Sequence, residues 1–325
     1  MPTSRCGQAI PIRWMAAATY SSWRGATTTP LPPTAKRSKL KPDFSDYGEY
    51  LKLANVYADQ KKPDMASAAF RQFAQRASNL SQLYVPGFEA QFKQAAGDFD
   101  GALASYRQAV LQLGRAKQSE AAATFLLQFS FLSVLLREGP SALSFAQQQK
   151  LDDEQLESVA FLQTMAGNRS AAQRSLQRFA ASHPWVTRRV VEIDQTVYDM
   201  NAAVERGGGQ AALSRAARIP SFQWHYVLFL KARAHLLTND YASAEPEFRS
   251  ALRLEHNMEN FYFSTDRSPA IEILSHYYLG QLYERTGKHD QAINEHQEFL
   301  SHFSNPQTKL AQVGDARTAL KRLMQ

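Results

Sequence analysis

The chain has 325 residues, and its content of 44% hydrophobic residues, 15 glycines and 14 prolines excludes a collagen-like or wholly disordered protein. Its single cysteine, Cys6, excludes an intramolecular disulfide and a cysteine-rich metal site. The formal net charge of +7 arises before Asp43, where seven Lys and Arg residues stand without an acid. The other 30 basic side chains balance the 30 acidic ones, so we expect no nucleic-acid partner.

Residues 1–42 form a basic leader rich in Ser, Thr, Pro and Ala, in which we expect disorder. Its arginines and its lack of acids allow three interpretations: a mitochondrial presequence, a linker from an upstream domain, or a solvated tail. A secretory signal is disfavoured because Pro11 and Arg13 interrupt its apolar stretch. We expect a cytoplasmic protein, with a mitochondrial location, or a periplasmic one as part of a larger regulator, as alternatives.

From about Asp46 onward, helical stretches alternate with short breaks. The first stretch repeats apolar residues every three or four positions, the period of one helix face, at Tyr47, Tyr50, Leu51, Ala54 and Tyr57. A break at 61–64 separates it from a partner stripe over 65–73. Further pairs are predicted around turns at Gly97-Asp98, 138–140, Gly167-Asn168, Asn239-Asp240 and Gly287-Lys288.

Five times in the chain a small residue is followed twelve positions later by alanine. The pairs are Ala54 and Ala66, Ala90 and Ala102, Ala160 and Ala172, Ala232 and Ala244, and Gly280 and Ala292. A fixed spacing of this kind indicates that two helices touch at the same point in each unit, where only a small side chain lets the backbones approach. The sequence therefore predicts an all-α array of stacked helix pairs.

Three stretches depart from this period. Residues 185–217 fit it poorly and are expected to form a long helix, a flexible break at Gly207-Gly208-Gly209 and a shorter helix. Residues 255–268 are expected to form an insertion, since the units around Ala232 and Gly280 lie 48 residues apart. Residues 307–323 resemble a terminal helix that covers the last unit. We thus divide the chain into the leader, 1–42, and a helical repeat domain, 43–325.

No segment offers the roughly 18 consecutive apolar residues that a membrane span needs. The longest candidate, Phe125 to Leu136, is interrupted by Gln128, Ser130 and Ser133. It is better interpreted as a helix buried inside the array.

The repeated residues resemble the tetratricopeptide repeat (TPR), most closely in the copy Tyr278-Leu279-Gly280, Tyr283, Gly287, Ala292, Phe299 and Pro306. The resemblance covers most of 46–306. It implies an α-α solenoid of about seven or eight helix pairs wound as a right-handed superhelix. It also implies a non-enzymatic scaffold that holds a peptide or helix in a concave groove lined by the first helix of each pair.

A narrower likeness leads to a second hypothesis. The run from Ala232 to Leu323 resembles the C-terminal repeat region of bacterial serine/threonine kinase and winged-helix regulatory proteins. That likeness implies a detached sensor module of a signalling system. The chain has no Gly-rich phosphate loop, His-Arg-Asp or Asp-Phe-Gly motif, so kinase chemistry is not expected in it. A mitochondrial TPR protein with a cleavable presequence is the third hypothesis.

Groups that could carry chemistry each have a structural interpretation, so we predict no catalytic residue, cofactor or metal. His289 and His296 lie seven apart, too far to chelate one ion from a helix, and are expected to be packed or on the surface. Asp152-Asp153-Glu154 are expected to begin a helix, and the glycines at 207–209 to form a turn. The compact basic spots, Arg188-Arg189 with Trp185 and Arg215 with Arg218, are expected to be a solvated face.

The predicted partner is therefore a protein or peptide, bound near the C-terminal units. Arg233 and Tyr226 lie two turns apart on one helix, where Arg233 is expected to pair with an acidic group of the ligand; Tyr262 and Phe263 in the insertion are expected to supply apolar anchors. A heat-shock chaperone tail is disfavoured. Asn55 matches the carboxylate clamp of such repeat domains, but Leu51 and Phe88 stand where Lys and Asn are needed.

Overall fold

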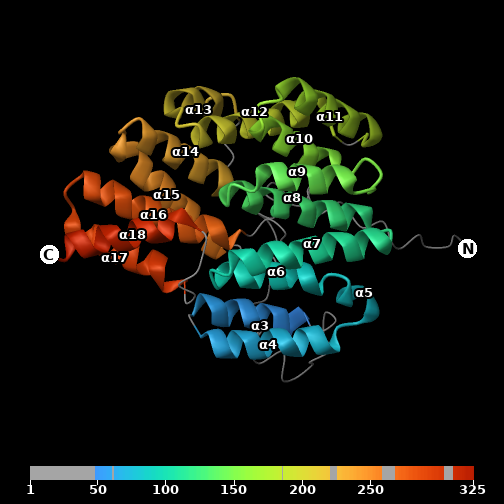
Figure 1. Ribbon diagram of the computed structural model, residues 1–325, viewed down its shortest axis with the longest axis horizontal. Helices are drawn as coiled ribbons and strands as arrows, with labels where there is room; N and C mark the ends of the chain where they lie inside the picture. The colour runs from blue at the N-terminus through green and yellow to red at the C-terminus, as the bar shows by residue number, and fades with distance from the viewer. Residues whose placement is uncertain (1–47, 61, 185, 220–224, 258–267, 304–309) are drawn as a thin grey trace, which may run out of the picture.

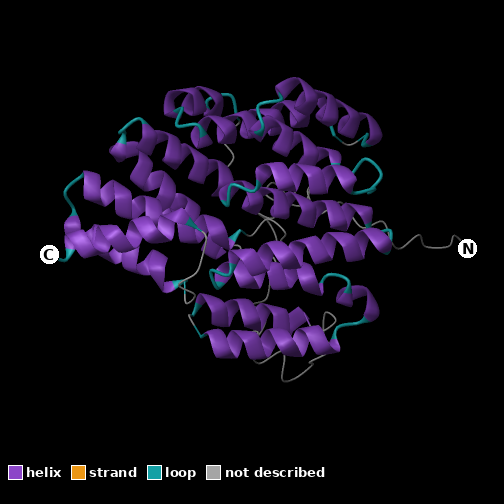
Figure 2. Ribbon diagram, in the orientation of Figure 1, coloured by secondary structure: helices purple, strands orange, loops and turns teal. Residues whose placement is uncertain are grey.

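The computed structural model describes residues 48–60, 62–184, 186–219, 225–257, 268–303 and 310–325, and every regular element in them is a helix (Figure 1, Figure 2). Seven antiparallel pairs follow one another as units 1 to 7. They are α3 (Gly48–Asp59) with α4 (Pro63–Arg76), α6 (Val85–Ala95) with α7 (Phe99–Arg115), α8 (Ser119–Leu135) with α9 (Gly139–Gln148), α10 (Leu156–Met165) with α11 (Arg169–Ser182), α12 (Arg188–Glu205) with α13 (Gly209–Ala216), α14 (His225–Leu237) with α15 (Tyr241–Asn257), and α16 (Pro269–Arg285) with α17 (His289–Ser301).

A single turn, α5 (Asn79–Gln82), follows unit 1, and α18 (Ala311–Leu323) packs against unit 7 as the terminal helix. The all-α solenoid of about seven or eight pairs expected from the sequence is confirmed, with seven pairs in the described residues. The leader, residues 1–42, and Tyr262 and Phe263 of the insertion lie outside the described residues.

One turn geometry recurs between the helices of the array. In the α6–α7 turn the N–H of Asp98 donates to the carbonyl oxygen of Lys93 at 2.9 Å, and Gly97 has a φ of 72°. This is the Schellman helix end, which needs one residue in the left-handed region. Glycine supplies it at 97, 167, 207 and 287, but Lys117, Arg137 and Asn239 take the same conformation despite its cost for a side chain.

The small residues at the repeated spacing lie where the paired helices touch. Nine of them are inaccessible to solvent: Ala54, Ala66, Ala90, Ala102, Ala160, Ala172, Ala232, Ala244 and Ala292. The tenth, Gly280, is also buried, and a Cβ there would lie 2.6 Å from the ring of His296. The array therefore fits a bulky histidine into unit 7 only because its partner position has no side chain.

Within the stretch 185–217, which fits the sequence period poorly, the expected long and short helices form a regular unit of the array. Its α12 and α13 are joined by the same turn, with Gly207 at a φ of 77° and the N–H of Gly208 donating to Ala203 at 2.8 Å. The residue twelve positions before the buried Ala212 is Met200, which is itself fully buried. Five other units carry a small residue at this position. The large side chain at this one position hid the unit from the sequence pattern.

The two helices of each pair occupy different layers. Four of the first helices, α8, α10, α14 and α16, bury residues around most of their circumference; α16, for example, buries eleven of its seventeen residues. The second helices bury one stripe only, as α11 does with Ala172, Leu176 and Phe179. The apolar run from Phe125 lies in α8 of the inner layer, and among the described residues there is no helix with the length and apolar character to cross a membrane.

Units 2 to 7 and α18 curl until their ends meet, and we call this body the closed ring (Figure 1). At the seam the ring of Phe99 lies 5.7 Å from that of Phe303, and His302 Nδ1 lies 3.3 Å from the carbonyl oxygen of Ala95. A Cβ on Gly97 would come within 2.3 Å of the carbonyl oxygen of His302. The first helices of these units therefore surround one central region, on the side where the sequence analysis expects a concave groove.

Unit 1 lies outside the closed ring and has a hydrophobic cluster of its own. The cluster comprises Leu51, Ala54, Ala69, Phe70, Phe73, Ala77 and Phe88. Its link to the ring is aromatic: Phe73 packs edge-on against Phe88 at 5.9 Å, and Phe70 stacks on Phe92 at 5.6 Å. The units from α6 onward share one continuous core.

Candidate functional site

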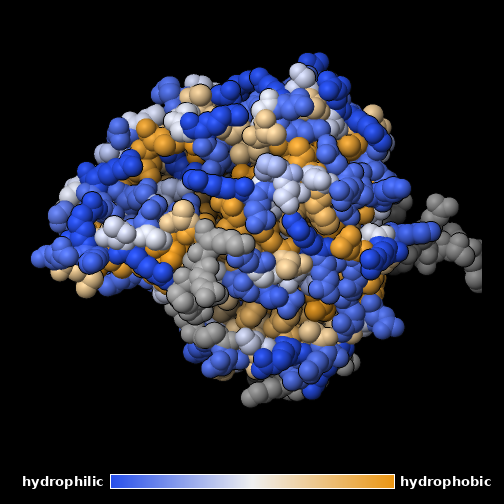
Figure 3. Space-filling model, in the orientation of Figure 1, coloured by the Kyte–Doolittle hydropathy of each residue, from blue (hydrophilic) through white to orange (hydrophobic). Residues whose placement is uncertain are grey.

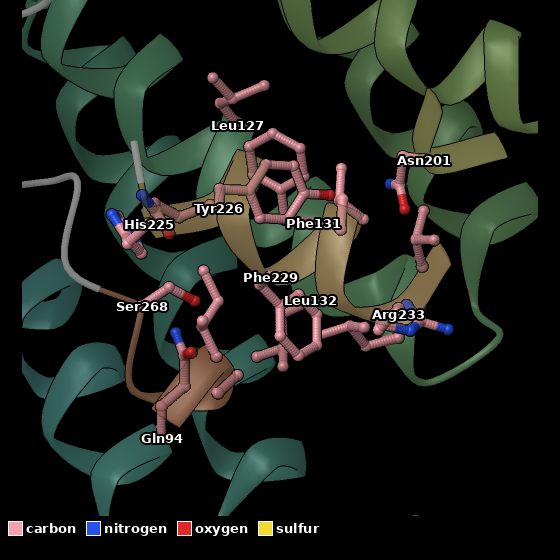
Figure 4. A pocket seen from close by; sticks show the side chains of 16 residues that line it. Gln94, Leu127, Phe131, Leu132, Asn201, His225, Tyr226, Phe229, Arg233 and Ser268 are labelled. Atoms are coloured by element: carbon pink, nitrogen blue, oxygen red, sulfur yellow. The ribbon is translucent and has the colours of Figure 1, made fainter. Parts of the chain in front are cut away.

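The inner helices converge on a small cavity of about 70 Å³, which we call the inner chamber (Figure 4). Its walls come from five of the seven units. They include Gln94 of α6, Leu127 and Phe131 of α8, Asn201 of α12, and Tyr226 and Phe229 of α14. Figure 3 shows apolar surface in the middle of this face of the molecule and a hydrophilic rim around it.

Helical spacing places these side chains on one face of each helix. Leu127, Phe131 and Leu135 follow at intervals of four on α8, and Tyr226, Phe229 and Arg233 at three and four on α14, so each set forms one stripe that lines the chamber. Phe131 packs against Tyr226 with ring centroids 4.9 Å apart. Two helices far apart in the sequence therefore make one aromatic wall.

The amide of Gln94 is a polar group in the wall of the chamber, and one of its atoms is buried without a partner. The side chain is 1% exposed and points from α6 toward the chamber (Figure 4). Its Nε2 donates to the hydroxyl of Tyr106 at 2.6 Å, whereas its Oε1 is buried without a hydrogen-bond partner among the described residues. A buried acceptor left unpaired costs about 1–3 kcal/mol, so this atom suits a donor brought by a ligand.

His225 and Tyr226 also line the chamber, and burial keeps both uncharged at neutral pH. Burial lowers the pKa of His225 to about 4, because the imidazolium would lose its hydration. Burial likewise raises the pKa of Tyr226, with Glu205 adding to the effect. The imidazole and the phenol in the wall of the chamber are therefore neutral.

A second cavity of about 360 Å³ adjoins the chamber and shares Leu135 and Arg233 with it; we call it the polar cavity. Besides these two it is lined by Leu136, Arg137, Glu205, Tyr278, Leu310, Ala311 and Gln312. These residues come from α8 and the turn after it, from α12, α14 and α16, and from the start of α18.

Arg233 forms the boundary between the two cavities. Its side chain is 11% exposed and pairs with Glu205 at 2.6 Å. Its guanidinium also lies 4.9 Å from the ring centroid of Tyr278 and 5.6 Å from that of Phe229. Burial lowers the pKa of Arg233, but Tyr278 and Glu205 outweigh it and the pKa is raised. The arginine is thus a fixed cation.

The structure brings two of the four predicted binding residues to one place. Tyr226 and Arg233 both line the inner chamber, while Tyr262 and Phe263 lie outside the described residues. The acidic group beside Arg233 is the chain's own Glu205, where the sequence analysis expected a ligand. Gln94 and Arg137 were missed. Arg137 left one signal: it fills a turn position that glycine or asparagine usually takes.

The remaining candidates are structural. His296 is 1% exposed with its Nε2 2.6 Å from Glu284 Oε1, and the described residues contain no group of three side chains placed to hold a metal. Asp153 and Glu154 lie in the turn before α10, not in its first turn as expected; they pair with Arg178 and His183, each at 2.6 Å.

The basic spots and the clamp positions lie in similar surroundings. Arg188 and Arg189 both pair with Glu192, while Trp185 lies outside the described residues. Leu51 and Phe88, at the positions of the carboxylate clamp, are buried in the cluster of unit 1. Apolar core residues occupy the places where a clamp would present charged and amide groups.

No protein-family model matches this chain, and no curated protein sequence matches it. Two solved structures resemble it in fold. One is a tetratricopeptide repeat protein from Parabacteroides merdae, at 13% identity and a TM-score of 0.43, covering 86% of this chain and 100% of that one. The other is the APC/C hetero-tetramer Cut9-Hcn1, at 14% identity and a TM-score of 0.37, covering 90% of this chain and 52% of that one.

This chain's own geometry makes it a TPR-like repeat protein. Seven antiparallel helix pairs, one recurrent turn and small residues at the helix contact of five units are the features of that architecture. The closure of units 2 to 7 is the feature that the sequence pattern did not indicate.

Proposed function

We propose that the protein is a non-enzymatic interaction scaffold that binds an extended segment of a partner protein by inserting one apolar side chain into the inner chamber. The observation behind this proposal is the unpartnered Oε1 of Gln94 within an apolar wall. A peptide brings both complements at once: an apolar side chain for Phe131 and Phe229, and a backbone N–H for the amide oxygen.

The position of the chamber favours a partner that several units recognise together. Residues from α6, α8, α12, α14 and the start of α16 line it, so its shape depends on the curvature of the closed ring. A scaffold of this kind serves equally as the sensor module of a larger signalling system. We place it in the cytoplasm, in keeping with a chain whose single cysteine cannot form an internal disulfide.

Affinity capture with a matched pair of variants tests this proposal. Leu127 lines the chamber and is half-buried, so Leu127→Asp should introduce a charge there without unfolding α8. Leu111 on α7 is 41% exposed and lies outside the chamber, so Leu111→Asp is the control. A protein captured by the native chain and by Leu111→Asp should be lost from Leu127→Asp.

Thermal melts followed by circular dichroism must be equal for the two variants before capture is compared. A partner that Leu127→Asp retains at full strength would exclude the inner chamber as the binding site. Capture lost by both variants would show that the loss does not depend on the inner chamber.

A further inference from the structure

The polar cavity contains one positive charge that nothing described in the structure balances. Two guanidinium groups, those of Arg137 and Arg233, and one carboxylate, that of Glu205, line it. Glu205 and Arg233 pair at 2.6 Å and neutralise each other. For the side chain of Arg137 there is no ion pair or hydrogen bond within the described part of the chain. The lining therefore favours a ligand with a single negative charge.

Arg137 is held at the mouth of this cavity by its backbone. It lies at a φ of 62° in the turn between α8 and α9, a conformation that four other turns of the array reach with glycine. The residue is exposed, so its guanidinium can meet a ligand without losing another partner. Arginine recognises a carboxylate by two parallel N–H···O hydrogen bonds, which fixes the orientation of the bound group.

The rest of the cavity indicates what the carboxylate is attached to. Leu135 and Leu136 form one wall, and the ring of Tyr278 lies over Arg233. Through Leu135 and Arg233 the cavity adjoins the inner chamber, whose walls are aromatic and aliphatic. A volume of about 360 Å³ is within the range of small-molecule sites. A ligand with its anionic end at Arg137 would place its body against apolar surface.

We propose that the polar cavity is a binding site for an apolar monocarboxylate, with the carboxylate bound by Arg137 and the apolar body directed along Leu135 toward the inner chamber. Glu205 holds Arg233 in place, so that two guanidinium groups face the carboxylate while the net charge of the lining stays at one. A free carboxylic acid and the C-terminal residue of a peptide share this chemistry. The site goes beyond the scaffold function and does not depend on it.

Two acids and their neutral amides test the site by isothermal titration calorimetry on the full chain. The probes are 4-phenylbutyrate with 4-phenylbutanamide, for a free acid, and N-acetylphenylalanine with its amide, for a peptide C-terminus. At least one acid should bind about tenfold more tightly than its amide, since only the acid offers the charged acceptor. Whichever acid binds more tightly identifies the source of the ligand.

Lys117 provides a matched control for Arg137, since it is also an exposed basic residue in the left-handed position of a turn, with a φ of 57°. It is not among the residues that line the polar cavity. Arg137→Gly and Lys117→Gly should relieve the same backbone cost, but only Arg137→Gly should raise the Kd of the acid by about tenfold. Arg137→Lys should recover part of the affinity.

Three results would overturn the proposal. The first is an amide that binds as tightly as its acid. The second is the absence of binding by both acids at concentrations of about 10 mM, where even a weak site would be occupied. The third is an equal loss of affinity in Lys117→Gly and Arg137→Gly, which would make the effect one of general surface charge.

Discussion

Unit 1 and four units of the closed ring carry small residues at the same spacing, yet the large side chains around those contacts are connected differently. Ala54 and Ala66 are as inaccessible as Ala90 and Ala102. In the ring, every unit contributes to one continuous core, and the seam joins its two ends. Unit 1 has a separate cluster and reaches the ring through Phe88 and Phe92.

The difference shows that two kinds of contact build the array. Alanine contacts pair the helices within a unit, and aromatic and aliphatic contacts join one unit to the next. In a stacked array each unit is stabilised by its neighbours, so a unit with one neighbour is expected to open before units with two. Unit 1 has one neighbour, whereas closure gives unit 2 and unit 7 contacts on both sides.

The largest expected effect comes from truncating an aromatic residue on each side of this boundary. Phe99 is 2% exposed at the seam and Phe73 is 1% exposed in unit 1. Each change to alanine should cost about 3–5 kcal/mol through lost burial and a cavity. Phe99→Ala should destabilise the ring as a whole, while Phe73→Ala should release unit 1 alone.

Hydrogen exchange combined with urea unfolding separates these two outcomes. In Phe73→Ala the amides of α3 and α4 should exchange quickly while those of α8 to α16 keep their native protection. If the ring loses protection in step with unit 1, the two bodies form one cooperative unit and unit 1 does not open by itself.

A second effect depends on pH and should be confined to the ring, because every histidine of the chain lies beyond unit 1. His225 has its pKa lowered to about 4 by burial, against an ordinary value near 6.5. The unfolded chain therefore binds a proton that the native chain does not. The contribution of this difference to the free energy of unfolding is fully present above pH 6.5, falls as the pH drops and is lost by about pH 4. In total it amounts to about 3 kcal/mol.

The measurement is the free energy of unfolding in urea between pH 7 and pH 4. His225→Gln should lose less stability over this range than the native chain, by about 3 kcal/mol. His289→Gln, at an exposed position, is the control and should follow the native profile. Equal profiles for all three proteins would show that folding leaves the pKa of His225 unchanged.

A third prediction compares alanine contacts on the two sides. Ala292 in the ring and Ala66 in unit 1 are both inaccessible to solvent. Leucine at either position should overpack the helix contact and cost about 1–3 kcal/mol. Ala292→Leu should lower the main thermal transition, whereas Ala66→Leu should affect only the part of the helical signal that unit 1 contributes. An unchanged melt for Ala292→Leu would refute the repeat register.

The smallest expected effect is a gain in stability. Lys117 takes the left-handed conformation between α7 and α8 that glycine takes in four other turns. Lys117→Gly should therefore stabilise the ring by about 1 kcal/mol, since glycine adopts this conformation without the steric cost of a side chain. A lower melting temperature for this variant would mean that the lysine side chain stabilises the turn by more than its backbone costs.

Much of the fold could be predicted because the relevant contacts are local in the sequence. The helix periodicity, the turns and the twelve-residue spacings each involve residues of one unit only. These patterns predict six of the seven pairs. The pair over 188–216 was described as a long and a short helix, but not as a unit of the array, because Met200 replaces the small residue there. This single large side chain removes the small-residue spacing by which the other units are recognised.

The candidate site was less accessible to prediction. Tyr226 and Arg233 were proposed from one helix face, and they do line the inner chamber. Gln94 joins them in the inner chamber, and Arg137 joins Arg233 in the polar cavity, only because units 2, 3 and 6 meet in space. Neither residue belongs to a motif, and the partner of Arg233 is Glu205 from the preceding unit.

The sequence by itself determined the helix pairs, their turns and the small residues at their contacts, because each of these depends on residues within about one unit of one another. Only the tertiary structure decided that the array closes, since Ala95 and His302 meet across 207 positions of the chain. Closure depends on small rotations between units that accumulate over the whole array. The total rotation cannot be predicted from any local sequence pattern. It is this total rotation that brings the walls of the inner chamber and the polar cavity together.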